Sequence, residues 1–235
     1  MNILAMDTSN HVMGVAILQE DTIIGEITTN LTKNHSVRLM PAVEQLMREV
    51  EMKPEDLDKI VVASGPGSYT GVRIALSTAK SMAWALDIPI VGISSLETLA
   101  YQGRLFQGYV CPFFDARRGL VFSGVYQWKG NKLEVIFEEK NLPMEELLLT
   151  LKEEGQPVLF LSPDLDKHEE KIAEVLGNQA VIPEGPYHTA SAGHLGLAGL
   201  FEEADATHNL TPNYLRLAEA EANWLKSQKE EKGYE

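Results

Sequence analysis

A hairpin pattern that occurs twice constrains the fold of this chain most strongly. Strand-like runs occupy residues 3–8, 12–18 and 23–28, and Asp7 stands at the first turn between them. The same form returns at residues 109–114, 120–126 and 133–137, where Asp115 takes the place of Asp7. Short polar or glycine-bearing segments separate the runs, as in a β-meander. The sequence therefore predicts two similar units that each open with the same hairpin.

Helical patterns and single strands follow each meander. In the first unit we expect helices at residues 36–51, 70–86 and 96–101 and strands at 60–63 and 89–92. In the second we expect a strand at 158–161 and helices near 144–153, 167–176 and 189–203, with an acidic helix after residues 212–216. We place the boundary after residue 104. Residues 1–104 form the first lobe with the dimerisation face, and residues 105–235 form a reduced second lobe with the C-terminal helix.

A glycine-rich turn joins the strand at 60–63 to the helix at 70–86. Its sequence from Ser64 to Gly71 is SGPGSYTG, in which Ser68 or Thr70 can cap the helix. Such a turn can hold an anion at the helix N-terminus or serve only as a structural turn, and both interpretations stay open. It is not a Walker loop, because Gly71 is followed by Val72 rather than by lysine. The glycine spacing also differs from that of dinucleotide-binding folds.

Composition excludes several classes of protein. The net charge of −14 and the lack of a basic stripe argue against RNA binding by this chain alone. No apolar run approaches the roughly 20 residues of a membrane helix, and the N-terminus lacks a basic signal-peptide region. The one cysteine, Cys111, sits in an apolar run, so that a disulfide or cysteine zinc site within the chain is excluded. We expect a cytoplasmic globular protein without membrane contact.

The two hairpin turns are candidate phosphate loops. Small residues at the first turn would let backbone amides reach a phosphate, whereas the second turn carries two long arginine side chains. The residues concerned are Asp7, Thr8, Ser9, Asp115, Arg117 and Arg118. Asp7 either binds a metal–phosphate group or holds the turn. Arg117 and Arg118 either pair with a carboxylate in the hairpin or meet a partner or nucleotide. The absence of a triple-glycine loop after residue 130 disfavours a kinase.

The duplicated plan resembles the two-lobed actin-like (ASKHA, ribonuclease H-like) α/β fold, here with an eroded second lobe. Several motifs more specifically resemble the bacterial TsaB (YeaZ) family and span almost the whole chain. They are residues 3–9 (ILAMDTS), 65–74 (GPGSYTGVRI), 93–97 (ISSLE), 115–118 (DARR) and 214–216 (YLR), with His35-Ser36, Leu39-Met-Pro41 and Ala79-Lys80. The chain departs from the family pattern at Val37, Leu120 and Phe122, positions that bear on local hairpin or partner contacts.

The resemblance implies a non-catalytic subunit that supports synthesis of N6-threonylcarbamoyladenosine (t6A) in tRNA. Such a subunit pairs with a TsaD-like transferase, supports docking of a TsaE-like ATPase, forms a homodimer when alone and meets tRNA only through the complex. It has no cofactor of its own, although ATP or ADP can lie at the interface with the catalytic partner. The histidine metal motif of that partner is matched here by Ser95 and Leu99, which cannot replace imidazole ligands.

Two apolar helices are the candidate dimer or partner interface. Their wide apolar arcs and small residues fit either complete burial within the lobe or one face packed on the sheet and another on a second subunit. With the resemblance we assign the interface to His35, Ser36, Leu39, Met40, Val43, Met47, Arg73, Leu76, Ser77, Ala79, Lys80 and Ala83. His35 has no second histidine four residues later, which favours a capping or surface role over metal binding.

Two enzymatic functions compete with the scaffold. The first is a small actin-fold phosphotransferase that uses Asp7 with Mg-ATP. The second, an M22-type metallopeptidase-like enzyme, needs a bound metal.

Overall fold

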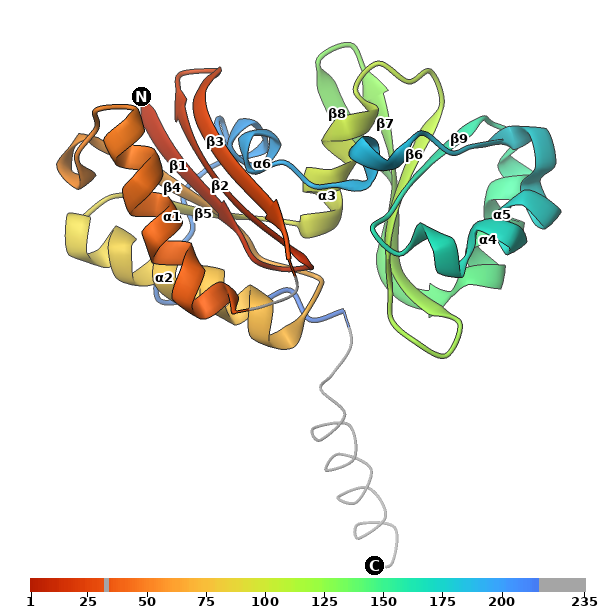
Figure 1. Ribbon diagram of the computed structural model, residues 1–235. Coiled ribbons are helices and arrows are strands. Elements are labelled where there is room, and N and C mark those ends of the chain that lie inside the picture. The colour runs from red at the N-terminus through yellow and green to blue at the C-terminus, as the bar shows by residue number, and fades with distance from the viewer. Residues whose placement is uncertain (32–33, 216–235) are drawn as a thin grey trace, which may run out of the picture.

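Two lobes, each built on a five-stranded sheet, make up the computed structural model, which describes residues 1–31 and 34–215 (Figure 1). The first sheet has the strand order β3-β2-β1-β4-β5. Its strands are β1 (Asn2–Asp7), β2 (Val12–Gln19), β3 (Thr22–Asn30), β4 (Lys59–Ala63) and β5 (Ile90–Ile93). The meander β1–β3 is antiparallel, whereas β1, β4 and β5 run parallel.

The second sheet repeats this topology. Its strands are β6 (Tyr109–Asp115), β7 (Leu120–Lys129), β8 (Lys132–Pro143), β9 (Val158–Leu161) and β10 (Ala180–Val181), in the order β10-β9-β6-β7-β8. Read from the meander edge, the order β8-β7-β6-β9-β10 matches β3-β2-β1-β4-β5 strand for strand. The prediction of a duplicated, two-lobed actin-like α/β fold is confirmed. The last strand of the second sheet pairs over only two residues, which reduces that lobe.

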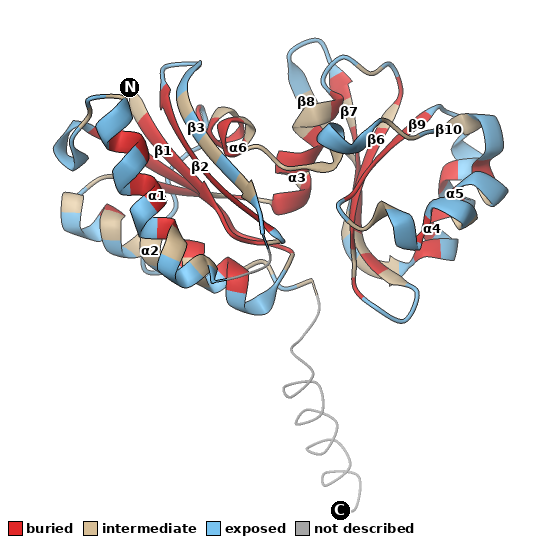
Figure 2. Ribbon diagram, in the orientation of Figure 1, coloured by how far each residue is buried: buried red, intermediate tan, exposed pale blue. Residues whose placement is uncertain are grey.

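Two helices cover one face of the first sheet and a third covers the other. Helices α1 (His35–Glu49) and α2 (Tyr69–Leu86) pack on Leu4 and Met6, whereas α6 (Ala192–Ala198) packs on Ile3 and Ala5. This alternation follows from the two-residue period of a strand. Because helices bury both faces, the central strands β1, β2 and β4 are continuous apolar runs, and they are buried except at the outer ends of β1 and β2 (Figure 2).

The second lobe is built in the same way. Helices α4 (Met144–Glu154) and α5 (Glu169–Leu176) pack on one face of its sheet, around Phe113 and Phe160. Helix α3 (Ser95–Ala100) follows β5 and packs on the other face with Leu96 and Leu99. Short 3₁₀ helices lie at Pro54–Asp56, Tyr101–Gly103, Leu165–Lys167, Gly177–Gln179 and Gly185–His188. No helix among the described residues is long and apolar enough to cross a membrane.

The domain boundary needs one correction. Neither predicted range forms one lobe, because α3, before residue 104, packs on the second sheet and α6, after it, returns to the first sheet. Gly196 permits this close packing, because a β-carbon there would lie 2.3 Å from Leu18 Cδ1. The helix expected at 189–203 is also shorter, since Ser191 caps it and it ends before Gly199. The predicted C-terminal helix, with Arg216 of the YLR motif, lies outside the described residues.

Candidate functional site

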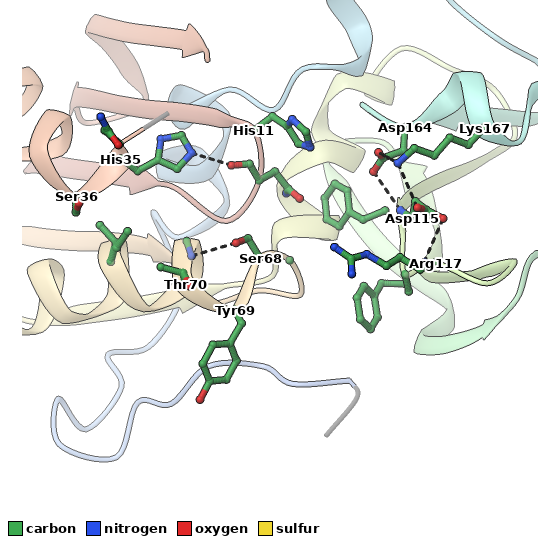
Figure 3. A pocket seen from close by; sticks show the side chains of 18 residues that line it. His11, His35, Ser36, Ser68, Tyr69, Thr70, Asp115, Arg117, Asp164 and Lys167 are labelled. Carbon is green, nitrogen blue, oxygen red and sulfur yellow. Dashed lines mark hydrogen bonds and ion pairs between the residues drawn. The ribbon is translucent and has the colours of Figure 1, made fainter. Parts of the chain in front are cut away.

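A cavity of about 750 Å³ lies between the two lobes (Figure 3). Its walls come from the first hairpin turn (Asn10 and His11), the N-termini of α1 and α2, and the second hairpin turn with the loop after β9. The two hairpins therefore face each other across a cleft, as the duplicated plan implies. The cleft is the place where an actin-like protein would hold a nucleotide.

The first candidate phosphate loop is buried by its own chain. Thr8 and Ser9 are completely inaccessible, and Asp7 is 3% exposed. The glycine-rich turn covers them: the amide of Ser68 donates to the carbonyl of Ser9 at 2.6 Å, and the Thr8 hydroxyl donates to the carbonyl of Gly71 at 2.7 Å. Of this turn, Asn10 and His11 rather than residues 7–9 reach the cleft.

Asp7 holds the hairpin turn. Its Oδ1 accepts a hydrogen bond from the amide of Ser9 at 2.7 Å. Burial raises the pKa of the Asp7 carboxyl above its ordinary value, although the hydrogen bonds from Ser9 act in the opposite direction. A buried carboxyl that is occupied by its own turn is poorly placed to hold a metal–phosphate group.

The glycine-rich turn brings α2 against this hairpin. Ser68 is the N-cap, and its Oγ accepts from the amide of Gly71 at 3.3 Å, so that Thr70 lies inside the first turn of the helix. A β-carbon on Gly67 would lie 2.2 Å from the carbonyl oxygen of Ser9. The glycines therefore serve close backbone contact between two segments of the chain.

An ammonium group occupies the second candidate loop. Lys167 Nζ lies 2.7 Å from Asp164 Oδ1 and 3.2 Å from Asp115 Oδ2 (Figure 3). His168 Nε2 lies 3.3 Å from Asp115 Oδ1. Burial alone would raise the pKa of the Asp115 carboxyl, but the hydrogen bonds from Lys167 and His168 outweigh burial and lower it. A metal ion at Asp115 would have to displace this ammonium. Together with the buried first loop, this arrangement does not fit a magnesium–nucleotide group.

The two arginines of the second turn have left-handed backbone conformations, with φ of 66° at Arg117 and 57° at Arg118. The amide of Arg117 donates to Asp115 Oδ1 at 3.3 Å, and its side chain points from the turn toward the first lobe (Figure 3). Arg117 lines the cleft, whereas Arg118 is exposed and does not.

His35 begins α1 and joins it to the first hairpin. Its Nε2 lies 3.0 Å from the carbonyl oxygen of Asn10, and Ser36 beside it also lines the cleft. Ser95 and Leu99, at the positions of the metal motif, are buried. Among residues 1–31 and 34–215, no group of three histidine, cysteine or carboxylate side chains is arranged to hold a metal ion.

The outer face of α1 and α2 differs in part from the predicted interface. Half of the assigned residues are buried in the core of the first lobe, because they form the stripe that faces the sheet: Leu39, Val43, Met47, Leu76, Ala79 and Ala83. The exposed assigned residues include Met40, Arg73 and Ser77, and Lys80 donates to the carbonyls of His208 and Leu210. Two further apolar residues of these helices are strongly exposed: Val37, at 66%, stands at a position already expected to bear on hairpin or partner contacts, and Trp84, at 73%, was missed. A lone tryptophan among small helical residues is the signal that would have identified the second.

Comparison with known proteins agrees with the motifs. Residues 22–224 match the family model described as TsaD: tRNA N6-adenosine threonylcarbamoyltransferase. The tRNA threonylcarbamoyladenosine biosynthesis protein TsaB of Bacillus subtilis (strain 168) is 52% identical over 97% of this chain and 100% of its own length. TsaB of Escherichia coli (strain K12) is 30% identical over 59% of this chain and 63% of its own length.

A solved structure agrees as well. The crystal structure of a Pseudomonas aeruginosa protein with similarity to peptidase YEAZ is 27% identical, with a TM-score of 0.80, and the match covers 92% of this chain and 99% of that one. The curated relative and this structure bear out the TsaB (YeaZ) resemblance over nearly the full length. The chain therefore belongs to the TsaB branch of the TsaD family, the proteins of tRNA threonylcarbamoyladenosine biosynthesis.

Proposed function

We propose that this protein is a non-catalytic scaffold of t6A synthesis, which binds a TsaD-like transferase through the outer face of α1 and α2. The observation that carries the proposal is the exposure of Val37, Met40 and Trp84 on two neighbouring helices whose opposite sides are anchored in the core. Methionine and aromatic side chains are enriched at protein interfaces relative to the rest of the surface.

The composition of this face suits a helical partner. Thr70, Ser77 and Ser81 are exposed on α2 and are short, so that a second helix can approach α2 closely. Methionine and tryptophan add adaptable and rigid apolar contact respectively. The same features permit self-pairing, and we expect a homodimer when the partner is absent.

Bond chemistry in the cleft has less support. The buried Asp7 and the ammonium of Lys167 beside Asp115 both oppose the phosphotransferase alternative. The metallopeptidase-like alternative has no favouring observation among the described residues. We further propose that a TsaE-like ATPase docks on the heterodimer, that any ATP or ADP is held at the interface with the partner, and that tRNA is met through the complex in the cytoplasm.

The test is size-exclusion chromatography with light scattering on this chain, alone and mixed with the TsaD-like protein of the same organism. The informative variant is Ser77→Arg, because Ser77 is exposed at the centre of the proposed face. Ala79→Arg is unsuitable, since Ala79 is fully buried and its replacement would disrupt the lobe itself.

Thr150→Arg is the matched control. Both hydroxyls donate to the carbonyl four residues earlier on an exposed helix face, Ser77 on α2 at 2.6 Å and Thr150 on α4 at 3.0 Å. We expect the wild type and Thr150→Arg to form a heterodimer and Ser77→Arg to stay unpaired while remaining folded. A Ser77→Arg protein that pairs as tightly as the control would overturn the assignment of the face.

A further inference from the structure

The segment after α6 ties the two lobes together. Residues 205–215, called the strap here, pass below α2 and end between the lobes (Figure 1). The strap begins at the edge of the first sheet, where the amide of Asp205 donates to the carbonyl of Ile90 and Asp205 Oδ2 accepts from the amide of Gly92 at 2.8 Å. Leu210 then packs into the first core, and Leu215 packs on the cluster around α3 in the second lobe.

Asn213 makes the bridge between the lobes. Its backbone amide donates to the carbonyl of Ser64, at the end of β4, at 2.7 Å. Its side-chain amide donates to Glu139 Oε2, on β8 of the second lobe, at 3.2 Å. One residue of the strap is thus hydrogen-bonded to both sheets, although it is distant from each in sequence.

Glu139 receives donors from both lobes. Its Oε1 accepts from the hydroxyl of Ser94, the N-cap of α3 directly after β5, and from the hydroxyl of Tyr126 on β7 at 2.5 Å. With Asn213 on the other oxygen, the carboxylate has three donors. Three hydrogen bonds from α3, β7 and the strap thus meet on one half-buried side chain, which holds these elements together where the lobes touch.

The strap also joins the outer face of α2. Tyr214 stacks on Tyr69, with ring centroids 5.5 Å apart, and its hydroxyl accepts from Arg73 Nε at 2.7 Å. The Arg73 guanidinium lies 3.8 Å from the centre of the Tyr69 ring. All three side chains are exposed, so a molecule that binds this part of α2 touches the strap one residue away from Asn213.

We infer that the strap is an inter-lobe latch that links the α2 face to the second lobe: a protein bound at Tyr69 and Arg73 holds Tyr214, and Asn213 then holds Glu139. The partner half of this inference rests on the proposed function, whereas the latch itself belongs to the chain alone. The strap therefore couples two sites, the α2 face and the inter-lobe contact at Glu139. The coupling acts because the strap is either docked on both sites or released from both. It makes the docking face and the cleft between the lobes respond to each other.

Asn213→Ala in the full chain tests the latch, with hydrogen–deuterium exchange as the measurement. We expect exchange roughly fivefold faster in α3 and in β8 around Glu139, with α4 unchanged, because one bridging hydrogen bond is lost. Asn209→Ala is the control, since Asn209 lies on the same strap with an exposed side chain. In the Asn209→Ala protein, exchange in α3 and β8 should equal that of the wild type. Equal exchange in the two variants would overturn the latch.

The partner half is tested by repeating the exchange with the TsaD-like protein at saturation. We expect slower exchange around Glu139 in the wild type and little slowing there in Asn213→Ala. Light scattering reports separately whether a complex forms. A complex without slower exchange in the wild type would overturn the coupling, and no complex would defeat it together with the proposed function. In either case the comparison of Asn213→Ala with Asn209→Ala, made without the partner, still tests whether the strap holds the two lobes together.

Discussion

Gly71 packs directly on Thr8: a β-carbon at Gly71 would lie 2.1 Å from the carbonyl oxygen of Thr8. The Thr8 hydroxyl donates to the carbonyl of Gly71 and accepts from the amide of Ala75 at 3.1 Å. The first hairpin and the first turn of α2 are thus fitted to each other through backbone atoms. This contact explains why a turn that looks like an anion site instead buries the loop that would bind phosphate.

Gly71→Ala should destabilise the first lobe strongly. The added methyl group would meet a backbone oxygen that cannot rotate away, and overpacking of this kind costs about 1–3 kcal/mol or more. We expect a loss of at least about 2 kcal/mol in the free energy of unfolding by urea denaturation. Gly185→Ala is the control, because a β-carbon there meets nothing within 4 Å. A Gly71→Ala protein as stable as this control would contradict the described packing.

Stability should fall as pH rises from about 5 to about 8 because of Glu97. Burial, with a smaller contribution from the charge of Glu139, raises the pKa of Glu97 from 4.5 to about 7. The folded protein therefore binds a proton that the unfolded chain releases between these values. The resulting stabilisation is complete below about pH 4.5 and is lost as pH rises through 7, with an upper limit of roughly 3 kcal/mol.

The check is the free energy of unfolding as a function of pH, in the wild type and in Glu97→Gln. The amide variant cannot ionise, so its profile should be flatter between pH 5 and 8, as measured by urea denaturation. A wild-type profile that rises with pH over this interval, or one that Glu97→Gln does not change, would contradict the prediction.

The sheets were predictable because each strand carries a local signal. The repeated hairpin around Asp7 and Asp115 identified the duplicated topology, since apolar runs of similar length alternate with turn residues in both halves. The return of α6 to the first sheet was not predictable in this way. A short helix with Gly193 and Gly196 shows no periodic apolar stripe, and only its contacts with Leu18 and Ile23 reveal where it packs.

The candidate site was predictable in its residues more than in its contacts. The turns with Asp7 and Asp115 were identified, but Lys167 stands far along the chain from Asp115 and lies in an ordinary charged segment. Glu139 and Asn213 likewise carry no motif that points to a bridge between lobes. The buried half of the predicted interface shows a related limit, because an apolar arc on a helix does not tell which side faces the sheet.

Lys167→Met should raise the pKa of Asp115. Burial would then be opposed mainly by the hydrogen bond from His168, so the carboxyl should titrate at a higher pH than in the wild type. In the wild type the lowered pKa of Asp115 contributes to the free energy of unfolding above about pH 4, and this contribution is lost as pH falls. The free energy of unfolding of Lys167→Met should therefore fall less in this pH range. The measurement is the carbon NMR titration of the Asp115 carboxyl.

Lys171→Met is the control for this titration. Lys171 also pairs with a carboxylate, Glu145 at 2.9 Å, but on the exposed surface between α4 and α5. It should leave the titration of Asp115 unchanged. If Lys167→Met also left the titration of Asp115 unchanged, the Lys167 ammonium would not be the group that lowers the pKa of Asp115.

Lys59→Met should loosen α6 from the first sheet. The side chain of Lys59 is buried, and its Nζ donates to the carbonyls of Gly199, Leu200 and Glu202 at 3.2, 3.0 and 3.2 Å. Gly199 is the C-cap of α6 and the other two carbonyls follow it, so the ammonium lies near the negative end of the helix dipole, where a cation is stabilising. Methionine would leave the carbonyls without their donor, at a cost of roughly 2 kcal/mol or more.

Urea denaturation and hydrogen–deuterium exchange together check this prediction. Exchange in α6 should increase more than exchange in α1, because the lost donor lies on the α6 side of the sheet. Lys132→Met removes an exposed ammonium at the start of β8 and should change neither quantity. If Lys59→Met also changed neither the stability nor the exchange in α6, the C-terminal end of α6 would be held by its apolar contacts alone. The hydrogen bonds from Lys59 would then contribute nothing to stability.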